Sequence, residues 1–295
     1  MTSDSIARFR RFARAVTAEV GALDSSFLGR GRPLGAARVV NAIGAGRTDV
    51  AEIRAYLNLD SGLMSRLLRS LEDEGLVITA PHPDDARRRV ARLTEAGQRE
   101  FSAYEGLSDA RASALLERAP RAEELLRAMD LVALTLGRDR ITIAEADPRS
   151  EAARSCLEAY YAELARRLET GFDVKLSCDP EAEAEAEAMA RPRGAFLLAM
   201  ADGLPVGCVG LKGNGGPVAE VKRLWIDPAA RGFGLARRLM HAVETAAREL
   251  SVAVLRLDTN SALPEALALY RKTGWVAIDR FNDDPYPDHF FEKTL

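Results

Sequence analysis

A turn rich in glycine and arginine is the part of the sequence whose residue types most clearly suggest chemistry. It lies in DPAARGFGLARRLMHAVETAAREL, after a strand expected over 218–226 and before an amphipathic helix. N–H groups at the start of that helix favour an anion, Gly232 and Gly234 allow close approach, and Arg231 adds positive charge. The turn therefore predicts a pyrophosphate site. A nucleotide, a dinucleotide and coenzyme A all satisfy it, and the spacing is neither a Walker A loop nor a G-x-G-x-x-G fingerprint.

The elements around this turn predict an α/β domain with a mixed, mostly antiparallel central sheet. AFLLAMADGLPVGCVGLKG forms two strands joined at Ala-Asp-Gly ahead of the strand at 218–226. A helix of alternating Glu and Ala is expected over 179–192, with Asp179 and Pro180 as N-cap and first residue. The other expected elements are strands at 141–147, 252–260 and 289–295 and helices at 149–169 and 261–275.

The turn and the helix at 261–275 resemble two motifs of the GNAT superfamily of N-acetyltransferases. Arg231, Gly234 and Ala236 match its R-x-x-G-x-[GA] signature, and ALALYRKTGW matches its A-x-x-L-Y-x-x-x-G-[FW] ending. The resemblance covers about residues 141–295 and implies acetyl-CoA (coenzyme A) as the cofactor. The residues it implies for binding are Leu224, Trp225 and Ile226 along the pantetheine, Arg231, Gly232, Phe233, Gly234, Leu235, Ala236 and Arg237 around the pyrophosphate, and Asn260 and Tyr270 from later elements.

Two residues are candidates for the transfer chemistry that this resemblance implies. Tyr270 matches the tyrosine whose hydroxyl protonates the departing thiolate, and the alternative is a core aromatic residue. Glu220 matches a position of the general base that an attacking amine needs, and the alternative is a salt bridge to Lys222 or Arg256. The loop before the last strand holds candidate acceptor contacts, or ordinary loop residues: Asn282, Asp284, Tyr286 and His289.

In the first half, the helix expected over 61–75 separates apolar and polar side chains onto opposite faces. Leu63, Leu67, Leu68 and Leu71 form the apolar face, and Ser65, Arg66 and Arg69 form the polar one. In a helix-turn-helix the second helix enters the major groove, where Arg can bind guanine. A solvated amphipathic helix explains the same pattern. A short core helix is expected over 34–44, and Asp49 with Glu52 predicts the cap of the helix after it.

A hairpin follows this helix. LVITA (76–80) and RRRVARL (87–93) are expected strands around the turn-rich PHPDDA, and Thr94 is expected to cap a further helix. Three consecutive arginines beside the hairpin tip are typical of a wing that contacts the phosphate backbone. We expect one of Arg88 and Arg89 simply to face solvent.

The hairpin resembles the wing of the MarR family, which carries D-x-R, five residues and then L-T. Here these are Asp85, Arg87, Leu93 and Thr94, and the resemblance runs from about residue 5 to 137. It implies a winged helix-turn-helix that binds double-stranded DNA as a homodimer formed through its first and last helices. Apolar stripes in both helices would form that interface or pack within one chain. The implied DNA contacts are Ser61, Ser65, Arg66, Arg69, Arg87 and Arg88.

Composition favours a two-domain cytoplasmic protein. At 295 residues the chain exceeds one ordinary domain, and its apolar runs are too short to span a bilayer. Three widely spaced cysteines and three histidines predict no disulfide framework and no metal site. Residues 1–140 hold 22 Arg, no Lys and 20 acidic residues, so the argument for DNA rests on where the arginines lie.

These patterns predict an all-α-rich winged helix (α+β) at 1–139, for DNA binding and dimerisation, and a GNAT domain at 140–295. The predicted function is a DNA-binding transcriptional regulator that is also an acetyl-CoA-dependent N-acetyltransferase, acting on an unidentified amine by direct transfer. One alternative is a transcription factor whose GNAT domain senses acetyl-CoA or an amine without turnover. Another is an acetyltransferase whose winged helix serves only for dimerisation. The short GRDR connection suggests coupling between ligand and operator binding, and a simple tether between the domains is equally compatible with it.

Overall fold

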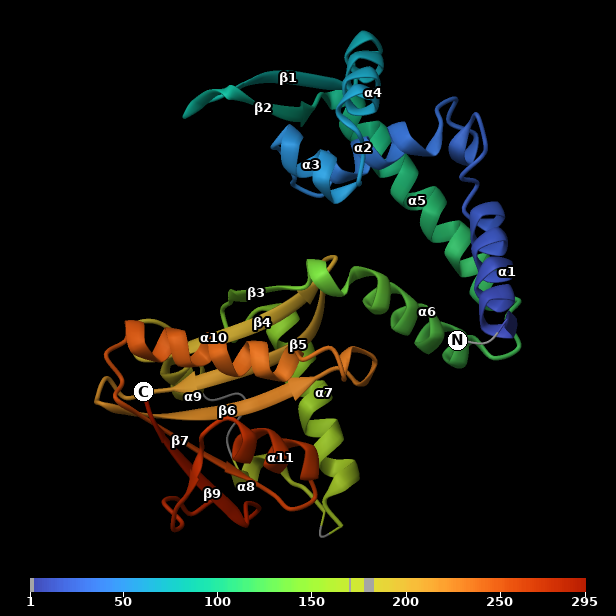
Figure 1. Ribbon diagram of the computed structural model, residues 1–295. Coiled ribbons are helices and arrows are strands. Elements are labelled where there is room, and N and C mark those ends of the chain that lie inside the picture. The colour runs from blue at the N-terminus through green and yellow to red at the C-terminus, as the bar shows by residue number, and fades with distance from the viewer. Residues whose placement is uncertain (1–2, 170, 178–182) are drawn as a thin grey trace. The chain divides into compact units, whose positions relative to one another are not determined.

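Figure 1 shows the computed structural model, which describes residues 3–169, 171–177 and 183–295. Contacts divide the chain into two compact units, Met1–Ala122 and Glu123–Leu295. Helix α6 (Ala122–Gly137) begins at this division, and its Leu134 is buried in the core of the second unit. The domain boundary expected after residue 139 followed from family resemblance, and it stays a prediction.

The first unit is a set of helices with one antiparallel hairpin. Its core includes Val39, Val40, Met64, Leu71 and Val77, from two helices and the first strand. The elements are α1 (Ser3–Glu19), a 3-10 turn (Phe27–Gly29), α2 (Leu34–Gly44), α3 (Val50–Tyr56), α4 (Ser61–Asp73), β1 (Val77–His82), β2 (Asp85–Leu93) and α5 (Glu95–Glu117). The expected helices and hairpin are confirmed, and the two strands extend closer to the tip than the sequence indicated.

Side-chain caps begin three of these helices. Asp49 accepts two backbone N–H groups at the start of α3, and Asp60 and Thr94 each accept one at the starts of α4 and α5. These bonds satisfy donors that the first turn of a helix leaves without an intrahelical partner. The caps at Asp49 and Thr94 lie where the sequence predicted.

The buried face of α4 differs slightly from the expected one. Met64, Leu68 and Leu71 are buried, whereas Leu63 and Leu67 are only partly buried. The helix is therefore rotated relative to the expected leucine stripe, and methionine replaces leucine as the most enclosed residue near its start.

Arg88 joins the hairpin to α3. Its Nε and Nη2 atoms lie 2.8 and 2.7 Å from Oδ2 of Asp49. The backbone N–H of Glu52 and the Arg88 guanidinium together lower the pKa of Asp49, because they stabilise the ionised carboxylate. One carboxylate thus caps a helix and anchors the wing.

The next arginine also has protein partners. Arg89 donates to the Thr79 hydroxyl across the hairpin and lies 4.0 Å from Glu72 of α4. Its side chain is nevertheless 61% exposed, against 46% for Arg88, so Arg89 is the one of the two that mainly faces solvent.

In its described residues, the second unit forms a seven-stranded mixed sheet with helices on both faces. Strand order is β3-β4-β5-β6-β7-β9-β8, and among these described strands only the β6–β7 pair is parallel. Leu239 and Val243 of α10 pack on one face, and Cys156 of α7 packs with Phe196 on the other. The elements after α6 are a 3-10 turn (Arg138–Arg140), β3 (Thr142–Glu145), α7 (Glu151–Arg167), α8 (Val174–Ser177), α9 (Glu183–Ala188), β4 (Ala195–Ala201), β5 (Leu204–Lys212), β6 (Val218–Ile226), a 3-10 turn (Pro228–Ala230), α10 (Leu235–Glu249), β7 (Val254–Thr259), α11 (Pro264–Lys272), β8 (Val276–Ala277) and β9 (His289–Thr294).

The expected fold class of the second unit is confirmed. The structure also describes the alternating Glu-Ala helix as α9. Its expected N-cap at Asp179 and Pro180 lies outside the described residues.

The parallel pairing of β6 with β7 is short. It runs from Val218–Val254 to Glu220–Arg256, after which β6 keeps its pairing with β5, and β7 with β9. Further along β6, two residues oppose one residue of β5, and one of them, Arg223, has a φ of +59°. This is a β-bulge, which bends a strand and redirects its side chains. The sheet thus opens between β6 and β7.

Removal of the Asp49 carboxylate is expected to loosen α3 and the hairpin together. Asp49→Ala removes both a helix cap and the partner of Arg88, whereas Asp60→Ala removes a cap alone, worth about 1 kcal/mol. We expect faster amide hydrogen exchange in β2 of the full-length chain for Asp49→Ala and an unchanged rate there for Asp60→Ala. Equal β2 exchange in the two variants would contradict the anchoring role of Asp49.

Candidate active site and nucleic-acid interface

A cleft of about 500 Å³ lies where β6 separates from β7. The end of β6, the turn before α10, α7 and α11 form its walls. Nine of the residues expected to bind the cofactor line it: Leu224, Trp225, Ile226, Arg231, Gly232, Gly234, Leu235, Ala236 and Arg237. The structure therefore brings together the two groups, strand and turn, that the sequence placed in one site.

The turn has the conformation expected of an anion-binding loop. Gly232 and Gly234 have φ values of +84° and +75°, which L side chains rarely adopt, and nothing lies within 4 Å of a Cβ added at either. The N-cap residue of α10 is Gly234, which has no side chain that could accept a hydrogen bond from the first turn of the helix. The first N–H groups of α10 therefore face the cleft without such a cap, and the turn fits the pyrophosphate of coenzyme A.

The Arg231 guanidinium was expected to face the pyrophosphate, but it binds protein groups instead. Its Nη2 lies 2.5 Å from Oε2 of Glu163, and its Nε donates to the Ile226 carbonyl at 3.1 Å. The same Glu163 accepts the Trp225 indole N–H at 3.0 Å and pairs with Arg167 at 2.7 Å. Arg231 thus holds the turn against β6 and α7.

Glu163 was missed by sequence reasoning. It is only 8% exposed, yet it faces two cations and an indole donor from three elements. Its spacing of four residues from Arg167 on one helix was a signal for an ion pair, although not for a position in the cleft. A buried carboxylate is stable here because each oxygen has a charged donor.

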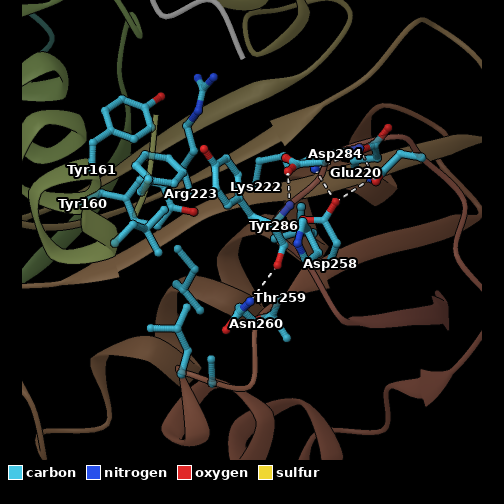
Figure 2. A pocket seen from close by; sticks show the side chains of 18 of the residues that line it. Tyr160, Tyr161, Glu220, Lys222, Arg223, Asp258, Thr259, Asn260, Asp284 and Tyr286 are labelled. Atoms are coloured by element: carbon cyan, nitrogen blue, oxygen red, sulfur yellow. Dashed lines mark hydrogen bonds and ion pairs between the residues drawn. The ribbon is translucent and has the colours of Figure 1, made fainter. Parts of the chain in front are cut away.

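A second cavity of about 400 Å³ adjoins the first (Figure 2). The two share five lining residues: Tyr160, Leu164, Leu224, Leu263 and Ala266. Three expected acceptor contacts from the loop before β9 also line the second cavity: Asn282, Asp284 and Tyr286. A molecule in each cavity would therefore meet the other beside Tyr160 and Leu224.

Lys222 lies between two carboxylates in the second cavity. Its Nζ is 2.5 Å from Oδ2 of Asp258 and 3.3 Å from Oε2 of Glu220. Burial lowers the pKa of Lys222, but attraction to Asp258 and Glu220 outweighs this and raises it overall, so the lysine stays charged. The salt bridge considered for Glu220 is present with Lys222, whereas Arg256 pairs with Glu292 instead.

Two tyrosines, the buried Tyr270 and the partly buried Tyr160, line the second cavity together with Asp258. Burial raises the pKa of both Tyr160 and Tyr270, because it disfavours the charged phenolate. The nearby Asp258 carboxylate raises the pKa of Tyr270 further. Their phenols therefore keep their protons at neutral pH, which suits a proton donor. Tyr270 lines the second cavity alone, while Tyr160 lines both cavities. The sequence placed Tyr160 on a helix face without indicating a site there.

Three expected cofactor contacts, Phe233, Asn260 and Tyr270, do not line the cofactor cleft, and one expected acceptor contact, His289, does not line the second cavity. The Asn260 amide donates to the Tyr286 carbonyl at 2.6 Å and accepts the Ala262 N–H, so it organises a loop of the second cavity. Phe233 packs against the core beside the turn and lines neither cavity. His289 begins β9 and is likewise outside both linings.

In the first unit, the expected DNA-contacting side chains lie exposed on α4 and the hairpin. Ser61, Ser65, Arg66 and Arg69 are exposed on α4, and the Ser65 hydroxyl donates to the Ser61 carbonyl at 2.8 Å. Arg87 is exposed beside the tip, where its backbone N–H donates to Asp85 at 3.0 Å. Arg88 is half exposed and bound to Asp49, so its contact with DNA would require sharing its guanidinium.

The described residues form neither a metal centre nor a membrane span. No group of three or more His, Cys, Asp and Glu side chains among them is arranged to hold a metal ion. None of the described helices combines the length and apolar character needed to cross a bilayer.

Comparisons with known proteins agree with this geometry. The model described as "Acetyltransferase (GNAT) family" matches residues 157–275, and that of the MarR family matches residues 30–88. A protein of Azospirillum brasilense named IAA acetyltransferase is 39% identical over 36% of this chain and 72% of its own length. An uncharacterised N-acetyltransferase of Escherichia coli is 31% identical over 40% of this chain and 71% of its own length.

Among solved structures, a GNAT-family acetyltransferase of Staphylococcus aureus matches 52% of this chain and 99% of that chain, with TM-score 0.46 and 19% identity. One of Elizabethkingia anophelis, solved with acetyl-CoA bound, matches 53% of this chain and 99% of that chain, with TM-score 0.39 and 21% identity. The family match makes the protein an N-acetyltransferase with acetyl-CoA as its cofactor. The chain belongs to the GNAT family of acetyltransferases, and its residues 30–88, ahead of the acetyltransferase region, match the model of the MarR family.

Proposed function

We propose that the protein is a DNA-binding transcriptional regulator whose second unit acetylates an amine by direct transfer. The observation that carries the acetyl-transfer part is the pair of adjoining cavities, which share Tyr160 and Leu224. Acetyl-CoA supplies the acetyl group as a thioester. Because the two cavities meet, an amine in the second can attack a thioester that reaches the junction from the first. No covalent enzyme intermediate is then required.

In this proposal, separate groups of the chain bind the pyrophosphate and the pantetheine arm of the cofactor. The N–H groups at the start of α10 bind the pyrophosphate, and Arg231 keeps the turn in place through Glu163. The end of β6, over 224–226, lines the pantetheine arm with backbone groups that β7 does not pair. Arg237 lies exposed in the first turn of α10, where it adds positive charge.

Proton transfers are assigned to residues of the second cavity. An amine arrives as an ammonium ion and must lose a proton before it attacks. We assign this proton to Glu220, directly or through water, because its side chain is 32% exposed at the cavity beside Lys222. Tyr270 returns a proton to the departing thiolate, since its raised pKa keeps the phenol protonated.

The winged-helix region is proposed to bind operator DNA as a homodimer formed through α1 of the first unit and α6, which belongs to the second unit. α4 would enter the major groove, with the hairpin on the adjacent backbone. Phe9 and Val16 lie on one face of α1 and are 62% and 40% exposed, and Met129 and Leu136 of α6 are 40% and 69% exposed. Apolar side chains this exposed are suited to a second copy of the chain.

Gly234→Val is expected to abolish the rise in melting temperature that acetyl-CoA causes in the second unit. The valine is strained at a φ of +75° and projects at the anion site. The rise corresponds to about 2.7 kcal/mol at a ligand concentration of 100 Kd, and fluorescence reports it because both tryptophans lie in this unit. Gly203→Val is the matched control, with a φ of +88° and open space in the β4–β5 turn. An unchanged rise in Gly234→Val would place the cofactor elsewhere.

Tyr270→Phe is expected to lower kcat by about 10²-fold or more, the usual contribution of a positioned proton donor. The melting shift with acetyl-CoA should persist, because the change removes one oxygen outside the cofactor cleft. Tyr160→Phe is the comparison, since its phenol lies where the cavities meet. Full activity in Tyr270→Phe with loss in Tyr160→Phe would transfer the role to Tyr160.

Arg66→Ala and Arg69→Ala are expected to weaken binding to the specific operator, each by about 1–3 kcal/mol if the arginine binds a base bidentately. Arg87→Ala should weaken binding to all sequences and reduce its salt dependence, because a wing contacts phosphates. Arg99→Ala is the control, an exposed arginine of α5 outside both elements. DNA titrations at two salt concentrations measure these effects. Parental affinity in all three test variants would refute the proposed DNA surface.

A further inference from the structure

The second cavity is lined on one side by a continuous row of aromatic rings. Tyr160 and Tyr161 of α7 have centroids 5.3 Å apart, and Tyr161 stacks on Phe172 at 6.1 Å with an interplanar angle of 18°. Phe172 then contacts Tyr286 at 4.9 Å. All four rings line the cavity. The row starts at the junction with the cofactor cleft, because Tyr160 lines both cavities.

Hydrogen bonds hold this row across two separate loops. The Tyr286 hydroxyl accepts the Asp173 N–H at 2.7 Å and donates to the Asp173 carbonyl at 3.3 Å. The Asn260 amide donates to the Tyr286 carbonyl at 2.6 Å. Phe172 and Tyr286 are therefore positioned before any ligand arrives, which lowers the entropic cost of binding a flat group against them.

The charges of the same cavity favour a cation. Its lining includes three basic side chains, and each is paired with a lining carboxylate: Lys212 and Arg223 with Glu185, and Lys222 with Asp258 and Glu220. Two further carboxylates, Asp283 and Asp284, belong to the lining. Five carboxylates thus face three cations. An ammonium ion is attracted to this excess, whereas a carboxylate on the acceptor is repelled.

The carboxylates and the aromatic rings lie on different sides of the cavity, and this arrangement indicates which end of the acceptor carries its amine. Asp258 lines the second cavity and binds Lys222 of β6, two residues before Leu224, which lines both cavities. Figure 2 shows Tyr160 and Tyr161 on one side of the cavity and Asp258 and Glu220 on the other. A ligand with its ammonium end near the junction would extend its body along Tyr161, Phe172 and Tyr286.

We propose that the acceptor is an arylalkylamine, a primary amine joined by a short chain to an aromatic ring and lacking a carboxylate. This rests on the acetyl-transfer activity proposed above. The amine end lies near Asp258 and the thioester, and the ring stacks on the aromatic row, where offset or edge-to-face contacts are favourable. In the transfer, the ammonium first gives one proton to Glu220, and the amine nitrogen then forms a bond to the acetyl carbon as the carbon–sulfur bond breaks. The thiolate takes a proton from Tyr270, and the second proton lost by the nitrogen returns to that phenolate.

The test measures thiol release from acetyl-CoA by the full-length protein with five amines. Tryptamine and tyramine represent the proposed class, hexylamine lacks the ring, tryptophan adds a carboxylate, and spermidine adds charge without a ring. We expect kcat/KM for tryptamine or tyramine to exceed that for each of the other three by at least tenfold. Highest activity with hexylamine, tryptophan or spermidine would overturn this inference and leave the acetyl-transfer proposal standing. No release with any of the five amines, together with an intact melting shift by acetyl-CoA, would overturn this inference and would count against a small amine as the acceptor in the proposed transfer.

Phe172→Leu tests the aromatic row directly, because it removes a ring that contacts both Tyr161 and Tyr286 and retains apolar volume. We expect KM for tryptamine to rise by at least tenfold and KM for hexylamine to change by less than twofold. Phe281→Leu is the matched control, since Phe281 contacts Phe290 at 5.6 Å and lies outside the cavity lining. Equal changes for both amines in Phe172→Leu would show a structural effect and count against ring recognition.

Discussion

The separation of β6 from β7 is the constraint on which the acetyltransferase unit depends. Parallel pairing ends at Glu220–Arg256, so one edge of β6 is left without a strand partner on that side. Unpaired backbone groups need partners, and a pantetheine arm can provide them. The same opening separates the two sets of walls that become the cofactor cleft and the acceptor cavity. The bulge at Arg223 lies within this stretch and redirects the strand where the two cavities meet.

Several charged side chains in this unit pair with each other across different elements. Glu163 binds Arg167, Arg231 and the Trp225 indole, and so connects a helix, the cofactor turn and β6. Lys222 is enclosed between Glu220 and Asp258 in the other cavity. Such pairs position neighbouring groups more than they stabilise the fold, because burial of each charge offsets much of the attraction. Their effect is to keep the walls of both cavities in place before a ligand binds.

Much of the fold was predictable because it depends on local signals. The caps at Asp49 and Thr94 each need only a side chain and the next few backbone N–H groups. The turn at Gly232 and Gly234 was predictable for the same reason, since the conformation belongs to glycine itself. Partners far apart in the sequence were not predictable. Arg88 and Asp49 are separated by 39 residues, and nothing in the wing motif indicates that this arginine anchors the hairpin.

By itself, the sequence determined the order of elements, the position of the pyrophosphate turn and the resemblance to two families, because each depends on residues close together in the chain. Only the tertiary structure decided which side chains share a cavity. It placed Tyr160 at the junction, bound Arg231 to Glu163 across 68 residues and assigned Asn260 to the second cavity's loop. It also placed Phe172 against Tyr286, although more than 100 residues separate them. The physical reason is that such contacts depend on where the sheet opens and how its helices pack, which no local pattern specifies.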